Sequence, residues 1–242
     1  MTTPTLFNRK SPTEATLHIY GAIGDFGITA QSVAEALSAA TGVKVLRVYV
    51  DSPGGDLMAG KAIYNQLARF AANAEVVATV DGVAASAASF LIMGATRILM
   101  APQSTMMIHE AQAAVVGRAS EMRKLADVLE SETANLIAIY AKRTGRKPDE
   151  IAAMLAAETW MTAEEAVGAG FADEVVSDTP TNAAPATITA QSRVDDARRA
   201  MRMAAMTVEA LRIRSLRNAA SRVATPGQPG PTTNAVPEEH TV

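Results

Sequence analysis

Residues 76–93 have the sequence Val-Val-Ala-Thr-Val-Asp-Gly-Val-Ala-Ala-Ser-Ala-Ala-Ser-Phe-Leu-Ile-Met. The apolar run Val76–Val80 predicts a buried strand, and the run Ala87–Met93 after Ser86 predicts a helix. A hydroxyl at such a strand-to-helix turn is exposed and faces the positive end of the helix dipole, which stabilises a developing oxyanion. Small residues on both sides of Ser86 let a substrate backbone approach closely. This stretch therefore predicts the nucleophile of a serine hydrolase.

Strand and helix patterns alternate on both sides of this stretch. The expected strands are Leu17–Tyr20, Val43–Val50, Glu75–Val80, Arg97–Met100, Thr105–His109 and Phe171–Val176. The expected helices are Ala30–Ala40, Leu57–Ala71, Ala119–Thr144, Lys147–Ala157 and one that begins at the capping-box pair Thr162 and Glu165. This alternation predicts an α/β domain with mainly parallel strand pairing.

The composition excludes several classes of function. The chain has 242 residues, of which 48% are hydrophobic, so it can build a substantial core. The net charge of −3 gives no electrostatic basis for binding nucleic acid. Cysteine is absent, which excludes disulfides and thiolate metal sites. We expect no cofactor and no metal.

The sequence also predicts a cytoplasmic location. The first ten residues lack the apolar core of a secretion signal. The longest uncharged run, Gly82–Thr96, is too short to span a bilayer. The absence of cysteine is in keeping with a reducing compartment. We therefore expect no association with a membrane.

Composition divides the chain into five segments. They are an N-terminal segment (residues 1–16), a catalytic domain (17–177), a linker rich in Thr, Ala and Pro (178–192), an arginine-rich amphipathic helix (193–223) and a disordered tail (224–242). The helix has one narrow apolar stripe and a basic remainder, so we expect it to gain stability by docking onto an acidic partner.

A nucleophilic serine needs a base, and His109 is the best candidate among the three histidines. His18 lies within the first expected strand, and His240 lies in the expected tail. His109 ends an expected strand, which could carry its imidazole to a cleft beside Ser86. An imidazole there accepts the serine proton and returns it to the leaving amine.

The turn Ser52-Pro53-Gly54-Gly55 supplies candidate donors for an oxyanion. A backbone free of side chains lies close to an extended peptide, and its amides can stabilise negative charge on a carbonyl oxygen. In isolation such a turn is equally typical of an ordinary strand-to-helix connection. A glycine turn, a serine among small residues and a histidine on a strand, in this order, are together far more specific.

These parts resemble the motifs of ClpP, the proteolytic subunit of the Clp protease. The motifs are Ser52–Gly55, Gly82–Ser86, Met107–His109 and Met161–Asp173, and the resemblance runs from about Leu17 to Val176. Within the family, Glu158-Thr159-Trp160 and the added tail are most similar to the ClpP-like head maturation proteases of tailed phages and prophages.

The resemblance implies a role for each site residue. Ser86 is the nucleophile, His109 is the general base, and the amides of Gly55 and Ala87 form the oxyanion hole. Glu158 occupies the position of the family's third triad member, which is usually an aspartate. Its extra methylene changes the reach of the carboxylate, so a solvated loop carboxylate is an equally good interpretation of Glu158.

The resemblance also implies the architecture and the partners. The expected fold is the ClpP and crotonase type of β-β-α superhelix with a long handle helix, here Ala119–Thr144. Such subunits form homo-oligomeric rings, in which two rings stack through their handles and enclose the active sites. The implied substrate is a protein or peptide, in the phage relatives a capsid or scaffold protein, which is also an acidic target suited to the arginine-rich helix.

Two departures argue against docking to a Clp ATPase. Glu110-Ala111-Gln112 follows His109, where the family usually has a Gln-Pro pair. The segment before Leu17 is short and does not match the family's axial loop. The chain has no phosphate-binding loop, so any ATP hydrolysis would belong to a partner.

Four alternatives stay open at this point. An ATP-dependent Clp subunit would degrade unfolded proteins. A crotonase would act on acyl-CoA thioesters and needs no Ser–His pair. A membrane-associated signal-peptide peptidase relative would use a serine–lysine dyad, for which Lys61 and Lys124 are available. A ring-forming scaffold with a decayed triad would have no activity. This hypothesis stays open because Glu158 stands where the family usually has an aspartate.

Overall fold

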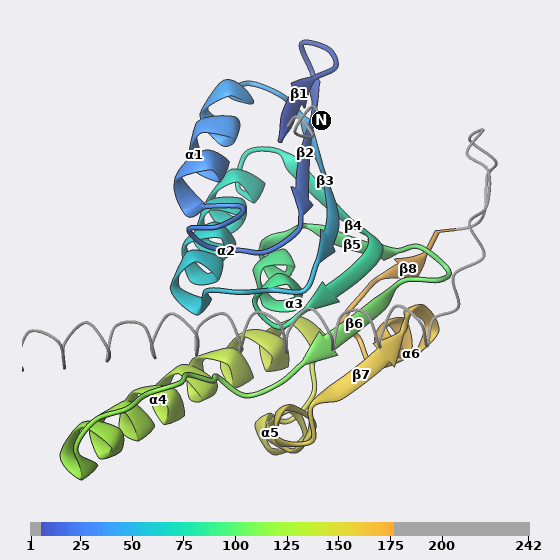
Figure 1. Cartoon of the computed structure of the whole chain (residues 1–242). Helices are drawn as coiled ribbons and strands as arrows, with labels where there is room; N and C mark the ends of the chain where they lie inside the picture. Colours follow the sequence, from blue (N-terminus) through green and yellow to red (C-terminus); the bar gives the residue numbers. More distant parts are fainter. Residues whose placement is uncertain (1–5, 177–242) are drawn as a thin grey trace, which may run out of the picture. The chain divides into compact units, whose positions relative to one another are not determined.

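The computed structural model describes residues 6–176 of the chain. The expected linker (178–192), arginine-rich helix (193–223) and tail (224–242), with His240, lie outside these residues. Within residues 6–176, strands and helices alternate around one mixed sheet of eight strands, as the sequence predicts for an α/β domain (Figure 1).

The sheet is mainly parallel. Its strands are β1 (Phe7–Arg9), β2 (Glu14–Tyr20), β3 (Val45–Ser52), β4 (Glu75–Ala85), β5 (Arg97–Met100), β6 (Thr105–Ile108), β7 (Thr159–Thr162) and β8 (Glu174–Val175). The main path runs β1-β2-β3-β4-β5-β8, and β6 pairs with the far end of β4 and with β7. Only the β1–β2 and β6–β7 pairs are antiparallel within the described residues.

Helices cover one face of this sheet and its lower edge (Figure 1). They are α1 (Ala30–Ala39), α2 (Leu57–Ala71), α3 (Ala87–Leu91) with a following 3₁₀ turn (Ile92–Gly94), α4 (Ala119–Thr144), α5 (Pro148–Ala156) and α6 (Ala163–Gly168). Alternate residues of β3 (Leu46, Val48 and Val50) are buried in the core. Helix α1 begins at Thr29, whose side chain accepts a hydrogen bond from the Ser32 amide.

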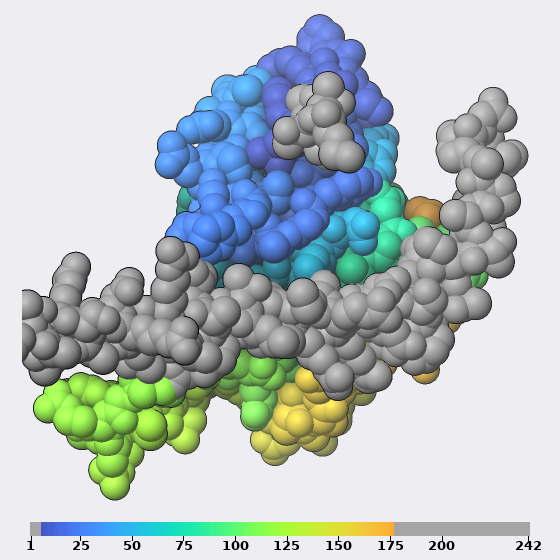
Figure 2. All heavy atoms as spheres, viewed as in Figure 1, coloured from blue at the N-terminus to red at the C-terminus, as the bar shows by residue number. Residues whose placement is uncertain are grey.

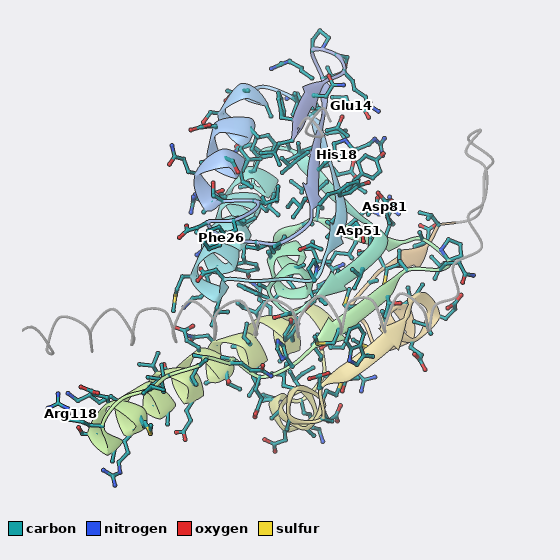
Figure 3. All side chains as sticks on the ribbon, viewed as in Figure 1. Glu14, His18, Phe26, Asp51, Asp81 and Arg118 are labelled. Carbon is teal, nitrogen blue, oxygen red and sulfur yellow. The ribbon has the colours of Figure 1, made fainter. Side chains whose placement is uncertain are left out.

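The opposite face of β2 and β3 is only half-buried and carries polar and aromatic side chains. His18 stacks on Tyr49 with ring centroids 5.3 Å apart and meets Tyr20 edge-on. Figure 3 shows His18 and Asp51 on the side of the sheet away from α1 and α2.

Within the described residues, no helix is both long enough and apolar enough to cross a membrane.

Strand β4 is longer than the sequence pattern predicts. The expected strand ends at Val80, whereas β4 continues to Ala85. The register shifts here, because Val50 pairs with Val80 whereas Ser52 pairs with Ala84. Asp51 supports the bulge by accepting a hydrogen bond from the Val83 amide at 3.0 Å. The strand therefore reaches the residue before Ser86.

Other elements also differ from the expected ones, mainly near the two ends of the described residues. Strand β1 and the first residues of β2 lie in the expected N-terminal segment, where β1 has three residues, two of them polar. Strand β7 is also short and follows a residue with positive φ, Glu158. Strand β8 begins at Glu174 instead of Phe171, because the Phe171 amide bonds back to the Ala166 carbonyl at 2.9 Å.

Helix α4 has the predicted bounds, but only its C-terminal half packs in the core. Leu136 and Tyr140 are buried, whereas Met122 and Val128 are exposed to 45% and 48%. The first half extends beyond the rest of the described domain, and its atoms form a protrusion in the space-filling view (Figures 1 and 2). Apolar side chains on a protruding helix are typical of an interaction surface.

Candidate active site

Ser86 occupies a strained turn between β4 and α3. Its φ is 54° and its ψ is −123°, a conformation that costs a residue with a side chain of order 1–3 kcal/mol. The Ser86 amide donates to the Met107 carbonyl at 3.0 Å, as the last bond between β4 and β6. The next residue already belongs to α3, so the chain reverses within one residue and presents a half-buried side chain at the end of the sheet.

A buried hydroxyl pair supports this turn from behind. Ser89 Oγ donates to the Ser86 carbonyl at 2.7 Å and lies 2.8 Å from Tyr140 Oη. Ser89 is completely buried. Tyr140 belongs to α4, so this helix helps to hold the Ser86 turn.

His109 lies directly beside Ser86. It follows the last residue of β6, and its Nε2 lies 2.7 Å from Ser86 Oγ. Parallel pairing of β4 with β6 brings the ends of the two strands together, since Ala85 pairs with Met107. This is the distance at which an imidazole can accept a proton from a hydroxyl.

Burial lowers the pKa of the His109 imidazole below its ordinary value, because desolvation disfavours the charged ring. The carboxylates of Glu158 and, to a smaller extent, Glu110 act in the opposite direction and raise this pKa. Burial is the larger effect, so the ring is neutral at neutral pH and able to accept a proton.

Glu158 reaches the neighbourhood of His109 through strand pairing. Thr159 of β7 pairs with Ile108 of β6, so the antiparallel register places Glu158 opposite His109. The hydrogen bond of the Glu158 side chain goes to Trp160, whose Nε1 donates to Oε1 at 3.2 Å. The carboxylate is exposed and acts on His109 through its charge.

The Nδ1 atom of His109 contacts Gln112, a residue that sequence reasoning did not assign to the site. Gln112 Nε2 lies 2.8 Å from Nδ1. The residue belongs to the segment between β6 and α4, which has no regular secondary structure, and only its spacing of three residues from His109 could have indicated the contact. Tyr140 was also missed, because an aromatic residue in a helix predicts only core packing.

The glycine turn lies against the Ser86 turn. Gly54 has a φ of 90°, and a Cβ added there would lie 2.6 Å from the Ala85 carbonyl oxygen and 2.7 Å from Ser86 Cβ. Ile23 bonds to both neighbours of Gly55, accepting from the Asp56 amide and donating to the Gly54 carbonyl, each at 2.9 Å. Gly55 is exposed, and its own amide takes part in neither of these two hydrogen bonds.

The amide of Ala87 lies in the first turn of α3, where helical N–H groups have no acceptor within the helix. The Ser86 turn therefore has an amide of this kind on one side and the glycine turn on the other. Donors in such positions can stabilise an oxyanion formed by attack of Ser86 Oγ on a carbonyl.

The alternative candidate bases Lys61, Lys124 and His18 have other surroundings. Lys61 Nζ forms an ion pair with Glu132 of α4 at 2.6 Å, and Lys124 is exposed on the protruding half of α4. His18 stacks on Tyr49 on the sheet face described above.

Among residues 6–176, His, Asp and Glu side chains form no group of three or more that could hold a metal ion. The arrangement can carry out nucleophilic attack on a carbonyl with proton transfer through His109.

Comparison with known proteins gives a family for this fold and site. A model of the family described as Clp protease matches residues 14–179, more than half of the chain. The ATP-dependent Clp protease proteolytic subunit 2 of Nocardia farcinica is 31% identical over 143 residues, which cover 58% of this chain and 70% of the relative. The same subunit of Thermobifida fusca is 32% identical over 146 residues, or 60% and 71% of the two chains. The proteolytic subunit of Pleurastrum terricola is 34% identical over 149 residues, or 61% and 75%.

The chain belongs to the Clp protease family. It is a serine-type peptidase with the mixed α/β fold and long helix of ClpP. Membership in this family removes the crotonase alternative, in which the same type of fold acts on thioesters.

The close packing of the two turns predicts that Gly54→Ala disables the site. The added methyl would collide with backbone at Ala85 and displace Ser86, and a displacement near 1 Å costs reactivity on the order of 100-fold. Gly42→Ala is the matched control, because Gly42 has a φ of 86° but nothing within 4 Å of an added Cβ. Both variants should lose about 1–2 kcal/mol of stability from the positive φ.

The measurements are urea unfolding and the rate of labelling by a fluorophosphonate. We expect Gly42→Ala to be labelled at the wild-type rate and Gly54→Ala to be labelled far more slowly. Equal labelling of the two variants would show that the glycine turn does not hold Ser86.

Proposed function

We propose that the chain is an endopeptidase in which Ser86 is the nucleophile, His109 the general base and Glu158 the acidic third member. The observation that carries this proposal is the 2.7 Å contact between Ser86 Oγ and His109 Nε2 at a strained strand-to-helix turn. The same contact favours an active enzyme over a scaffold with a decayed triad.

In the proposed mechanism, Ser86 Oγ attacks the scissile carbonyl carbon while His109 Nε2 takes the hydroxyl proton. The amides of Gly55 and Ala87 stabilise the oxyanion, and Glu158 stabilises the imidazolium through its charge. The carbonyl re-forms, the C–N bond breaks, and His109 returns the proton to the leaving amine. Water then attacks the acyl-enzyme with His109 again as base, which releases the acid and restores the Ser86 hydroxyl.

We assign this activity to the processing of capsid or scaffold proteins during phage head maturation. Glu158-Thr159-Trp160 and the segment that follows the catalytic domain support this assignment. A cytoplasmic location, as expected from the sequence, would suit such a role. The arginine-rich residues 193–223 are proposed to dock onto the acidic shell protein.

The second candidate is the proteolytic subunit of an ATP-dependent protease that degrades unfolded proteins. The relatives described above are named as proteolytic subunits of ATP-dependent Clp proteases, and that similarity favours this candidate. The Glu110-Ala111-Gln112 sequence after His109 argues against docking to a Clp ATPase, because it replaces the usual Gln-Pro pair.

One assay tests the mechanism and separates the two roles. Wild type, Ser86→Ala, His109→Ala and the double variant are incubated with the neighbouring head proteins, and products are identified by mass spectrometry. We expect cleavage by wild type without ATP, a loss of roughly 10⁴-fold or more in each variant, and a double variant little worse than either. Near-normal hydrolysis by His109→Ala would refute the mechanism, and cleavage only with ATP and a Clp ATPase would select the second candidate.

The charge of Glu158 predicts a change in the pH profile. The carboxylate raises the pKa of His109, so Glu158→Gln should move the acid limb of kcat/KM to lower pH. The rate should fall on the order of tenfold, which corresponds to about one pKa unit of lost stabilisation of the imidazolium. Glu110→Gln is the control, with a shift in the same direction but smaller. An unchanged profile in Glu158→Gln would remove Glu158 from the mechanism.

We further propose a homo-oligomeric ring, with two rings stacked through α4. The partly exposed residues Leu125 and Leu129 and the exposed Val128 support a buried role for this half of the helix in the assembly. Enclosure of the sites would restrict cleavage to unfolded or co-assembled chains.

The assembly is tested by light scattering on Leu125→Glu with Val128→Glu. Carboxylates buried in an interface are strongly unfavourable, so the double variant should form smaller particles than wild type while circular dichroism stays unchanged. Arg123→Glu, a charge change at an exposed position of the same helix, is the control and should keep the wild-type size. A fully active wild-type monomer would contradict the proposal.

A further inference from the structure

The second nitrogen of the His109 ring has a partner that is not a carboxylate. Ser86 Oγ lies 2.7 Å from Nε2, and the side-chain amide of Gln112 lies 2.8 Å from Nδ1. The ring is thus held at both nitrogens, by the hydroxyl at one edge and by an uncharged amide at the other. Glu158, which the family pattern places in the third position, has its hydrogen bond with Trp160 instead.

The backbone next to Gln112 is fixed to the rest of the domain. The Ala111 amide donates to Thr133 Oγ1 of α4 at 3.2 Å, and the Ala111 side chain packs against the core. His109 on the other side follows β6, which is paired on both edges. Gln112 follows directly after the anchored Ala111, and its side chain lies against the His109 ring.

We propose that Gln112 is the positioning residue of His109, and that its amide selects which ring nitrogen carries the proton. The proposal rests on the proposed function and deepens it. An amide, in place of a carboxylate, makes the direct contact with His109 Nδ1. Cysteine peptidases with a Cys-His-Asn arrangement show that an amide can fill such a place in an unrelated fold.

The selection follows from the two faces of the amide. When Oε1 faces the ring, it accepts from Nδ1–H, so Nε2 has a lone pair and can accept the Ser86 proton. When Nε2 of Gln112 faces the ring, as at the 2.8 Å contact in this structure, it donates to a bare Nδ1. The proton then sits on the ring Nε2, which donates to Ser86 Oγ and cannot accept the serine proton. A rotation of the amide by 180° therefore exchanges the blocked tautomer of His109 for the tautomer that can accept the Ser86 proton.

Charge and hydrogen bonding are then supplied by different residues. The charged groups that act on His109 are Glu158 and Glu110, and both favour the imidazolium through space. Gln112 carries no charge, so it orients the ring without opposing the burial that keeps it neutral. A variant at Gln112 should change the tautomer of His109 and the ¹⁵N shifts of its ring, whereas one at Glu158 should move the titration midpoint and leave the tautomer unchanged.

The experiment uses full-length protein labelled with ¹⁵N-histidine. The chain has three histidines, and His109→Gln identifies the signals of His109. The variants are Gln112→Leu, which removes the hydrogen bond, and Gln112→Glu, which can only accept from Nδ1 at neutral pH. Gln31→Leu is the matched control, because Gln31 bonds to Glu35 on the surface of α1.

We expect Gln112→Leu to change the ring ¹⁵N shifts of His109 and to lower kcat by about tenfold with little change in KM, as for loss of one hydrogen bond. Gln112→Glu should fix the Nδ1–H tautomer, raise the titration midpoint of His109 and restore kcat. Gln31→Leu should match wild type in all three readouts.

Unchanged ¹⁵N shifts and titration of His109 in both Gln112 variants would overturn the proposal. That outcome is separate from failure of the proposed function, which would appear as wild type that neither labels with fluorophosphonate nor cleaves. If Ser86→Ala and His109→Ala abolish cleavage while both Gln112 variants leave the ring unaffected, only the role of Gln112 is lost.

Discussion

The positive φ of Ser86 is the constraint on which the rest of the site depends. A serine in this conformation is strained, and it persists because surrounding bonds fix each side of it. The β4–β6 ladder holds its amide, and Ser89 holds its carbonyl with support from Tyr140 of α4. Gly54 fits against it only without a side chain. The proposed nucleophile is thus positioned by the sheet, a distant helix and a turn at once.

Much of the fold could be predicted from the sequence, because its elements have strong local patterns. The bounds of α2 and α4 and of β5 follow from periodicity and from turn residues on each side. The patterns fail where a tertiary contact decides the backbone. Asp81-Gly82 has the composition of a turn, but the Asp51 carboxylate binds the next amide and keeps β4 in the sheet. Such a contact between distant residues leaves no local signal.

The site shows the same division between local pattern and tertiary contact. Ser86, His109 and the glycine turn could be proposed because each stands at a strand end with a characteristic composition. The roles of Gln112 and Tyr140 could not be predicted, since a glutamine in a loop and a tyrosine in a helix are common. Only the structure brings them to His109 and to Ser89. Glu158 is intermediate, because the register of β7 on β6 places it near His109 but its hydrogen bond goes to Trp160.

The proposed base of this site, His109, works under two opposing demands. It has to be neutral before it accepts the Ser86 proton, and burial meets that demand by lowering its pKa. It has to tolerate a positive charge once the proton is transferred, and the carboxylates of Glu158 and Glu110 meet that demand from a distance. A carboxylate bonded directly to Nδ1 would strengthen the second effect and weaken the first. An amide at Nδ1 orients the ring and leaves this balance to burial and to the more distant charges, so it suits a base that is already desolvated.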